Sequence, residues 1–209
     1  ESTDSTNKSN RLNKLPLNIL RELPDTIRNS SCKATIIKIL SEITGIERGN
    51  TEKTLYGAAI DIGTTTIAAY LYDLNNNKLI SVESMLNPQR KYGSDVISRI
   101  GYSSQCINNR IEMSECIQNA ISSLVKKLAL SAGLNTYDIY LITLAGNTTM
   151  LHLFLGLPAG NLAAAPFIPV TLAEHVFAPE ETGLAINPYG RILVLPSVSA
   201  YIGADTVAA

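Results

Sequence analysis

Residues 56–67 read Tyr56-Gly-Ala-Ala-Ile-Asp-Ile-Gly-Thr-Thr-Thr-Ile67, an apolar strand that ends in an acid, then a glycine and three consecutive threonines. A turn rich in exposed backbone N–H groups and hydroxyls can donate hydrogen bonds to phosphate oxygens, while Asp61 can hold Mg²⁺ through water. The alternative is an ordinary hairpin, in which Gly63 supplies a positive φ and the threonines favour strand. Both interpretations remain open on this stretch alone.

The sequence around this turn predicts a strand meander followed by helices and further strands. Alternating and β-branched runs predict five strands, the first ending at Ile62 and the others at 67–74, 78–85, 138–145 and 191–195. One apolar stripe predicts a long helix over 107–131 that Gly133 ends; it comprises Met113, Ile117, Ile121, Leu124 and Leu128. Shorter helices are expected at 95–100, with Ser94 as N-cap, and at 150–155. Residues 156–190, rich in Pro, Gly and Ala, are expected to be mostly irregular.

The chain is expected to have three parts. Residues 1–14 are rich in Ser, Thr, Asn and Lys, which is typical of a mobile tail. Residues 15–54 form a small linker subdomain, with a helix at 16–23 that stops before Pro24 and strands at 34–40 and 42–48. Residues 55–209 form the main domain. The start at Glu1 and the end at Ala209 in mid-pattern suggest a piece of a longer protein.

Composition excludes several classes of function. The 209 residues are 45% hydrophobic and carry a net charge of −1, so no basic footprint for nucleic acid or an anionic membrane appears. No apolar run approaches the roughly 18 residues of a membrane span, and the polar first residues lack a signal-peptide core. The three cysteines show no C-x-x-C spacing, which indicates a cytoplasmic protein without a metal or iron–sulfur site in this segment. His152 and His175 are expected to be packing or surface residues.

Two familiar nucleotide-binding loops are absent. The sequence contains no G-x-x-x-x-G-K-[ST], and no two glycines lie two apart, so G-x-G-x-x-G cannot occur. Any nucleotide would therefore be bound by a strand–turn–strand hairpin. Such a hairpin, followed by a meander, a helix and a further strand, resembles the ribonuclease-H-like fold that builds each half of the actin-like ATPases. The resemblance implies an α/β fold with a mixed five-stranded sheet and flanking helices.

A closer resemblance rests on motifs in chain order. They are Tyr56-Gly-Ala-Ala-Ile-Asp-Ile-Gly-Thr-Thr-Thr66, Asn87-Pro-Gln89, Tyr92-Gly-Ser-Asp-Val-Ile-Ser-Arg-Ile100, Ala145-Gly-Asn-Thr-Thr-Met-Leu-His-Leu-Phe-Leu-Gly156, Pro166-Phe167, Pro196 and Tyr201-Ile-Gly-Ala-Asp205. Over residues 15–209 the chain resembles the ATP-dependent reductive activators of corrinoid proteins. The resemblance implies that ATP binding and hydrolysis drive an electron from a [2Fe-2S] cluster to the cob(II)alamin of a methyl-transfer partner.

The chain departs from that family in two respects. It has no ferredoxin domain to carry the [2Fe-2S] cluster, since it lacks four cluster cysteines. A second phosphate loop and the adenosine-binding segment are expected beyond Ala209. The residues present would thus form one wall of the ATP site and bind nucleotide weakly. A missing half would expose apolar surface, so a homodimer is a further expectation.

The candidate site residues follow from the residue types and the resemblance. Asp61 is predicted to hold Mg²⁺ through water, and the β- and γ-phosphates of ATP are expected to lie against Gly63, Thr64, Thr65 and Thr66.

Four further candidates follow the later strands and helices. Asn147 and the preceding Gly146 are expected to contact the γ-phosphate or the attacking water, because ligands gather at strand carboxyl ends. Asp95 either orients that water or is stabilised by the dipole of the helix it opens. Asp205 is either a helix cap or a metal contact. Arg99 and Asn87 are expected to organise the loops.

The predicted function is ATP-dependent reductive activation of a corrinoid protein, with an external electron donor to the ferredoxin domain. One alternative keeps the fold but makes the protein a small-metabolite kinase, which needs a general base near the γ-phosphate. Another is a non-catalytic switch that uses nucleotide only to hold a partner-binding conformation.

Overall fold

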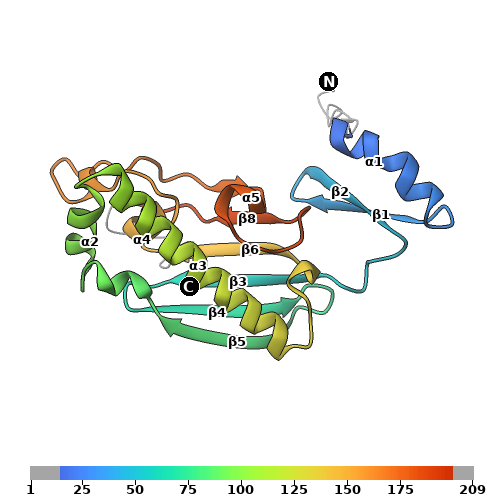
Figure 1. Ribbon diagram of the computed structural model, residues 1–209, viewed down its shortest axis with the longest axis horizontal. Coiled ribbons are helices and arrows are strands. Elements are labelled where there is room, and N and C mark those ends of the chain that lie inside the picture. Colours follow the sequence, from blue (N-terminus) through green and yellow to red (C-terminus); the bar gives the residue numbers. More distant parts are fainter. Residues whose placement is uncertain (1–14, 200–209) are drawn as a thin grey trace, which may run out of the picture. The chain divides into compact units, whose positions relative to one another are not determined.

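The computed structural model describes residues 15–199, and these divide into two compact units between Lys53 and Thr54. The first unit contains helix α1 (Leu17–Arg28) and the antiparallel strands β1 (Ala34–Ile39) and β2 (Glu42–Arg48) (Figure 1). Helix α1 packs against β2, and its apolar side buries Ile19.

The predicted end of the first helix before Pro24 is wrong, because α1 continues through Pro24 to Arg28. A proline inside a helix removes one hydrogen bond and normally kinks or ends it. Here Ile19 and Thr26, one on each side of Pro24, are both buried. We infer that packing of this face outweighs the local cost of the proline.

The second unit is built on one six-stranded mixed sheet. Its strands are β3 (Tyr56–Ile62), β4 (Thr66–Asp73), β5 (Lys78–Leu86), β6 (Ile139–Gly146), β7 (His175–Phe177) and β8 (Arg191–Val194). Their order across the sheet is β5-β4-β3-β6-β8-β7. The pairs β3–β6 and β6–β8 are parallel, and the other neighbours are antiparallel.

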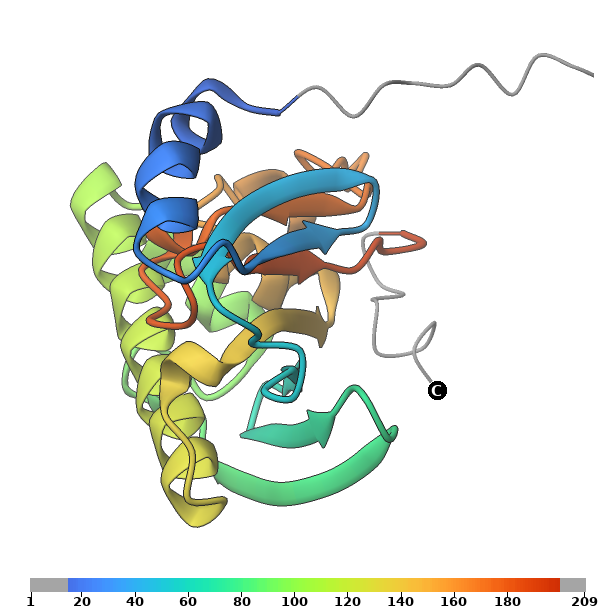
Figure 2. The same ribbon diagram turned by 90° about the vertical axis from the view of Figure 1, so that its right-hand side faces the viewer.

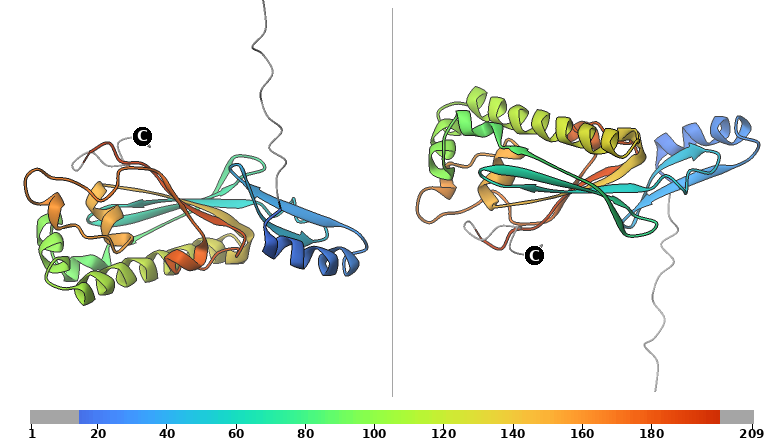
Figure 3. Two further views of the ribbon diagram at one scale, coloured as in Figure 1. Left: turned by 90° about the horizontal axis from the view of Figure 1, so that it is seen from above. Right: turned by 90° about the horizontal axis from the view of Figure 1, so that it is seen from below.

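Helices cover one face of this sheet. They are α2 (Val96–Ser103), α3 (Ile107–Ser131), α4 (Thr148–Phe154) and α5 (Pro179–Thr182), with short 3₁₀ turns at Pro88–Lys91, Thr136–Asp138 and Gly160–Leu162. Figures 2 and 3 show α3 lying along the face of the sheet. Within residues 15–199, no helix is long and apolar enough to cross a bilayer.

The core lies between α3 and this face. All five residues of the predicted stripe on α3 are fully buried, and they meet Ile60, Ile62, Ile67 and Leu71 of β3 and β4. Helix α3 ends as predicted: Gly133 takes a φ of +69°, and Leu134 N–H returns to the carbonyl of Ala129. The helical period of 3.6 residues therefore predicted both the extent and the buried face of α3 correctly.

The opposite face of the sheet is more open. On this face one residue from each strand lies in register with its neighbours and forms a row across the sheet: Val82, Tyr70, Ala59, Thr143, Leu193 and Val176. Three side chains of this row, Tyr70, Val82 and Val176, are exposed. Asp61 lies on the same face, because side chains alternate along a strand and its neighbours Ile60 and Ile62 are buried in the core.

The predicted mixed α/β architecture is confirmed, with three corrections of detail. The sheet has six strands rather than five, because β7 lies within the stretch expected to be irregular, as does α5. The N-cap of α2 is Asp95 rather than Ser94. Helix α4 begins at Thr148, two residues before the predicted start, because the Asn147 side chain accepts a hydrogen bond from Met150 N–H.

Candidate phosphate-binding site

The turn after β3 and the turn after β6 meet at one edge of the sheet. The two strands are parallel and in register up to Ile62 opposite Gly146, so the residues that follow them lie side by side. The amide Nδ2 of Asn147 donates a hydrogen bond to Oγ1 of Thr64 over 3.2 Å. The structure thereby joins two predicted site residues that are 83 positions apart.

Three consecutive carbonyl oxygens of the turn accept hydrogen bonds from Asn87 and Arg99. Asn87 Nδ2 donates to Gly63 O, an Arg99 terminal nitrogen donates to Thr64 O, and Asn87 N–H donates to Thr65 O, each over 2.8 Å. In a trans peptide unit the C=O and N–H groups point in opposite directions. These bonds therefore direct the N–H groups of Thr64, Thr65 and Thr66 away from Asn87 and Arg99. Successive backbone N–H groups that point to one side are a known means of binding an anion.

Close backbone approach explains the two glycines of the site. A Cβ on Gly63 would lie 2.5 Å from Thr66 O, and one on Gly146 would lie 2.9 Å from Ile62 O. Neither glycine has a positive φ. The hairpin interpretation, which needed a positive φ at Gly63, is therefore wrong on that point. The glycines are needed for space, as at a turn that a ligand or another backbone approaches.

The groups that hold the turn are themselves fixed by burial. Asn87 is 1% exposed and its Oδ1 accepts from Gln89 N–H over 2.9 Å, while Arg99 is fully buried and its Nε donates to Gly93 O over 2.9 Å. The expectation that Arg99 and Asn87 organise the loops is confirmed. Sequence reasoning missed Met150, whose Sδ accepts from the second terminal nitrogen of Arg99 over 3.4 Å.

Asp61 lies near the end of β3, two residues before Gly63 of the turn. Its cross-strand partners are Ala68 on β4 and Ala145 on β6, two small side chains, and Asp61 itself is exposed. Within residues 15–199, no group of three or more Asp, Glu, His or Cys side chains gathers as it would around a metal held by protein ligands alone. One carboxylate that shares Mg²⁺ with water and phosphate oxygens is compatible with this arrangement.

Two other candidates cap helices. Asn147 Oδ1 accepts from Met150 N–H over 2.9 Å at the start of α4, so its amide serves the helix and Thr64 together. Asp95 Oδ1 accepts from Ser98 N–H over 2.8 Å in a capping box, and this hydrogen bond lowers the pKa of Asp95. Asp205 lies outside the described residues.

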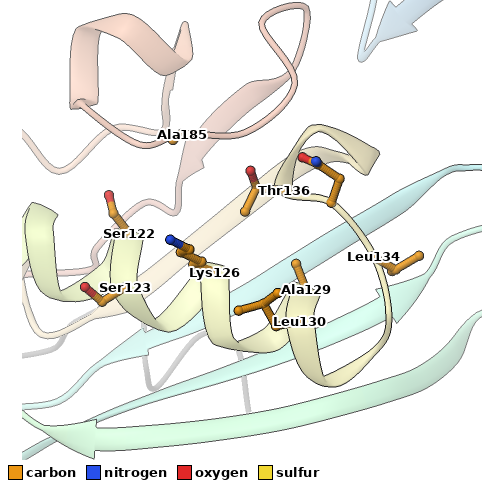
Figure 4. Close-up of a pocket in the computed structure, with 9 residues that line it drawn as sticks. Ser122, Ser123, Lys126, Ala129, Leu130, Leu134, Thr136 and Ala185 are labelled. Carbon is orange, nitrogen blue, oxygen red and sulfur yellow. The ribbon is translucent and has the colours of Figure 1, made fainter.

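A hollow of about 430 Å³ lies elsewhere in this unit (Figure 4). Its lining includes Ser122, Lys126 and Leu130 of α3, together with Thr136, just before β6, and Ala185. It is therefore at the opposite end of β6 from Asn147. Among the residues that line it, only Lys126 is basic.

Comparison with known proteins identifies the family of the chain. The profile of the family described as "RACo middle region" matches residues 56–209. The chain belongs to this family. The RACo middle region thus includes every candidate site residue named above, from Asp61 to Asp205.

Two relatives support the assignment. This chain is 38% identical over 157 residues to the "Corrinoid activation enzyme RamQ" of Eubacterium limosum, a match that covers 75% of this chain and 26% of that protein. A solved structure, "Reductive activator for corrinoid,iron-sulfur protein", matches with a TM-score of 0.85 and 30% identity over 91% of this chain and 31% of its own. The predicted family and the actin-like fold are thereby confirmed, and the chain spans under a third of either relative.

Proposed function

We propose that the protein carrying this chain is an ATP-dependent reductive activator of corrinoid proteins, and that this chain supplies one wall of its nucleotide site. The observation that carries the proposal is the turn at 63–66, whose three carbonyls are held by Asn87 and Arg99 so that its N–H groups face outward. The names of the two relatives support the corrinoid protein as the target.

In this proposal the turn holds the β- and γ-phosphates. Backbone N–H groups of Thr64, Thr65 and Thr66 donate to phosphate oxygens, and the threonine hydroxyls add further donors. Asp61, on the neighbouring strand end, holds Mg²⁺ through water. Phosphoryl transfer depends on such positioning and charge neutralisation more than on covalent steps by the protein.

The amide of Asn147 fixes the Thr64 hydroxyl and so sets the shape of the turn toward the γ-phosphate, with Gly146 giving the close approach. Asp95 is proposed to orient the attacking water. Its carboxylate would then combine that role with capping α2.

Hydrolysis of ATP to ADP and phosphate would accompany the transfer of one electron to cob(II)alamin, giving cob(I)alamin. The electron would come from a [2Fe-2S] cluster on a ferredoxin domain outside these residues, itself reduced by an external donor. We further propose a cytoplasmic location and, for the isolated chain, self-association through its open sheet face.

The test uses the full-length protein with a corrinoid partner, and follows cob(II)alamin reduction by absorbance with and without Mg·ATP. The expected result is nucleotide-dependent reduction that Asp61→Asn abolishes and Glu115→Gln leaves unchanged. Glu115 is an exposed carboxylate on α3, so its variant makes the same charge change away from the turn.

Measurements of phosphorylated product, ATP hydrolysis and partner binding on the same proteins separate the alternatives. A phosphorylated small metabolite in place of reduction would indicate a kinase. Reduction that persists in Asp61→Asn, with hydrolysis abolished and partner binding retained, would indicate a switch that uses nucleotide without coupling it to the electron.

A further inference from the structure

Arg99 is a buried cation without a buried anion. Its side chain is fully buried, and its three described partners are the carbonyl oxygens of Gly93 and Thr64 and the sulfur of Met150. Within residues 15–199, no carboxylate forms an ion pair with it. Burial lowers the pKa of Arg99, with Asp95 acting in the opposite direction and Arg90 in the same direction. A guanidinium nevertheless stays protonated in proteins.

Such an arrangement is costly unless a negative charge reaches it. Buried charges in proteins are normally paired or coordinate a metal, because desolvation of an isolated charge is unfavourable. The neutral acceptors around Arg99 satisfy its hydrogen bonds, and the exposed carboxylate of Asp95 compensates its charge only in part. The positive charge is therefore available to an anion nearby.

The hydrogen bond from Arg99 to Thr64 O brings the positive charge next to the backbone of the turn. Arg99 donates to the C=O end of the peptide unit whose other end is the Thr65 N–H. A cationic donor polarises the peptide it binds, and hydrogen bonds in such chains strengthen one another. The Thr65 N–H thus becomes a stronger donor on the side that faces away from the protein interior.

We propose that Arg99 is the buried countercharge of the phosphates bound at 63–66, acting through the Thr64–Thr65 peptide rather than by touching the nucleotide. Arg99 is in this sense a positioning residue whose charge, and not only its shape, raises affinity for phosphate. The inference rests on the proposed nucleotide function.

A pair of variants separates charge from shape. Arg99→Lys keeps the positive charge and loses the planar fork, whereas Arg99→Gln loses both the fork and the charge and keeps one neutral amide donor at about the position of the Arg99 Nε, which bonds Gly93 O. Ligand-free melting temperatures of the two variants identify any difference in folding. Arg110→Gln on α3 is the control for net charge. Should Arg99→Gln not fold, Arg99→Met, whose unbranched apolar side chain can pack beside Met150, supplies the neutral member of the pair.

The measurement is the Kd of Mg·ATP by calorimetry, with the full-length protein. The expected result is a loss of affinity of about tenfold or more in Arg99→Gln and a clearly smaller loss in Arg99→Lys, with Arg110→Gln unchanged. Equal losses in both Arg99 variants would show that Arg99 only shapes the turn, and unchanged affinity in both would remove it from the site; either result overturns the inference. No binding by the wild-type protein would instead overturn the proposed nucleotide function itself.

Discussion

The side-chain amide of Asn147 donates to the hydroxyl of Thr64 over 3.2 Å and, through its Oδ1, accepts from the first turn of α4. One side chain thereby joins the turn after β3 to the helix after β6. Asn147 therefore contacts the turn at 63–66 and the start of α4 at the same time.

Substitutions of Asn147 should separate its two roles. Aspartate remains a good N-cap, so Asn147→Asp should keep the thermal stability of the protein but weaken Mg·ATP binding, because it places a negative charge beside the phosphates. Asn147→Ala should also lose about 1 kcal/mol of stability with the cap. Melting curves and calorimetry measure the two effects. Unchanged Mg·ATP affinity in Asn147→Asp would show that Asn147 does not lie beside the bound phosphates.

A methyl group at Gly63 should deform the turn. Its Cβ would lie 2.5 Å from a backbone oxygen, Thr66 O, which cannot move without shifting β4. We expect Gly63→Ala to lose Mg·ATP binding by at least about tenfold, as the N–H groups lose their alignment. The control is Gly101→Ala in α2, where a Cβ meets nothing within 4 Å; it should stabilise the protein by about 0.5–1 kcal/mol. Wild-type affinity in Gly63→Ala would contradict the packing explanation.

Asp95→Asn tests whether Asp95 does more than cap α2. Asparagine caps helices about as well as aspartate, so the variant should melt near the wild-type temperature at neutral pH. If Asp95 orients the attacking water, ATP turnover should fall about 100-fold at an unchanged Kd for Mg·ATP. Full turnover in this variant would reduce Asp95 to a helix cap.

His152 should make stability depend on pH. It is 2% exposed, its Nδ1 bonds to Thr148 O over 2.7 Å, and its Nε2 accepts from Val170 N–H over 3.0 Å. Burial lowers the pKa of His152 below the ordinary value of 6.5. A lowered pKa in the folded state means that the unfolded state takes up the proton first, so stability should be full above pH 6.5 and fall as the pH drops below it.

His152→Leu removes this titration. At pH 8 it should cost about 1–3 kcal/mol, because the Val170 N–H loses its acceptor. Between pH 6.5 and pH 5 the variant should lose less stability than the wild type does. Urea denaturation at several pH values measures the free energy of unfolding, and so gives both the loss at pH 8 and the dependence on pH. An identical dependence of this free energy on pH in the two proteins would assign the acid sensitivity to other groups.

The elements with a strong period could be predicted from the sequence. The expected helix at 107–131 is observed there, because its apolar stripe from Met113 to Leu128 repeats over about four turns. The buried face of β3, formed by Ala58, Ile60 and Ile62, was likewise set by alternation. In both elements the local pattern and the tertiary packing agree.

Elements decided by distant contacts could not be predicted. Strand β7 has three residues, too few for any period to show, and it exists because Val176 pairs with Leu193 of β8. The continuation of α1 through Pro24 depends on burial against β2. At the site, the residue types indicated the turn. The hydrogen bonds that Asn87 and Arg99 donate to its carbonyl oxygens, from 24 and 35 residues away, depend on the fold and could not be predicted from the local sequence.

The most direct test is a calorimetric titration of Mg·ATP into the full-length protein and its Asp61→Asn variant, with Glu115→Gln as the control. The account predicts binding by the wild type and by Glu115→Gln, and binding at least about tenfold weaker in Asp61→Asn, because the variant loses the charge that holds Mg²⁺. Wild-type affinity in Asp61→Asn, or no binding by the wild-type protein, would contradict the assignment of residues 61–66 as a phosphate and magnesium site.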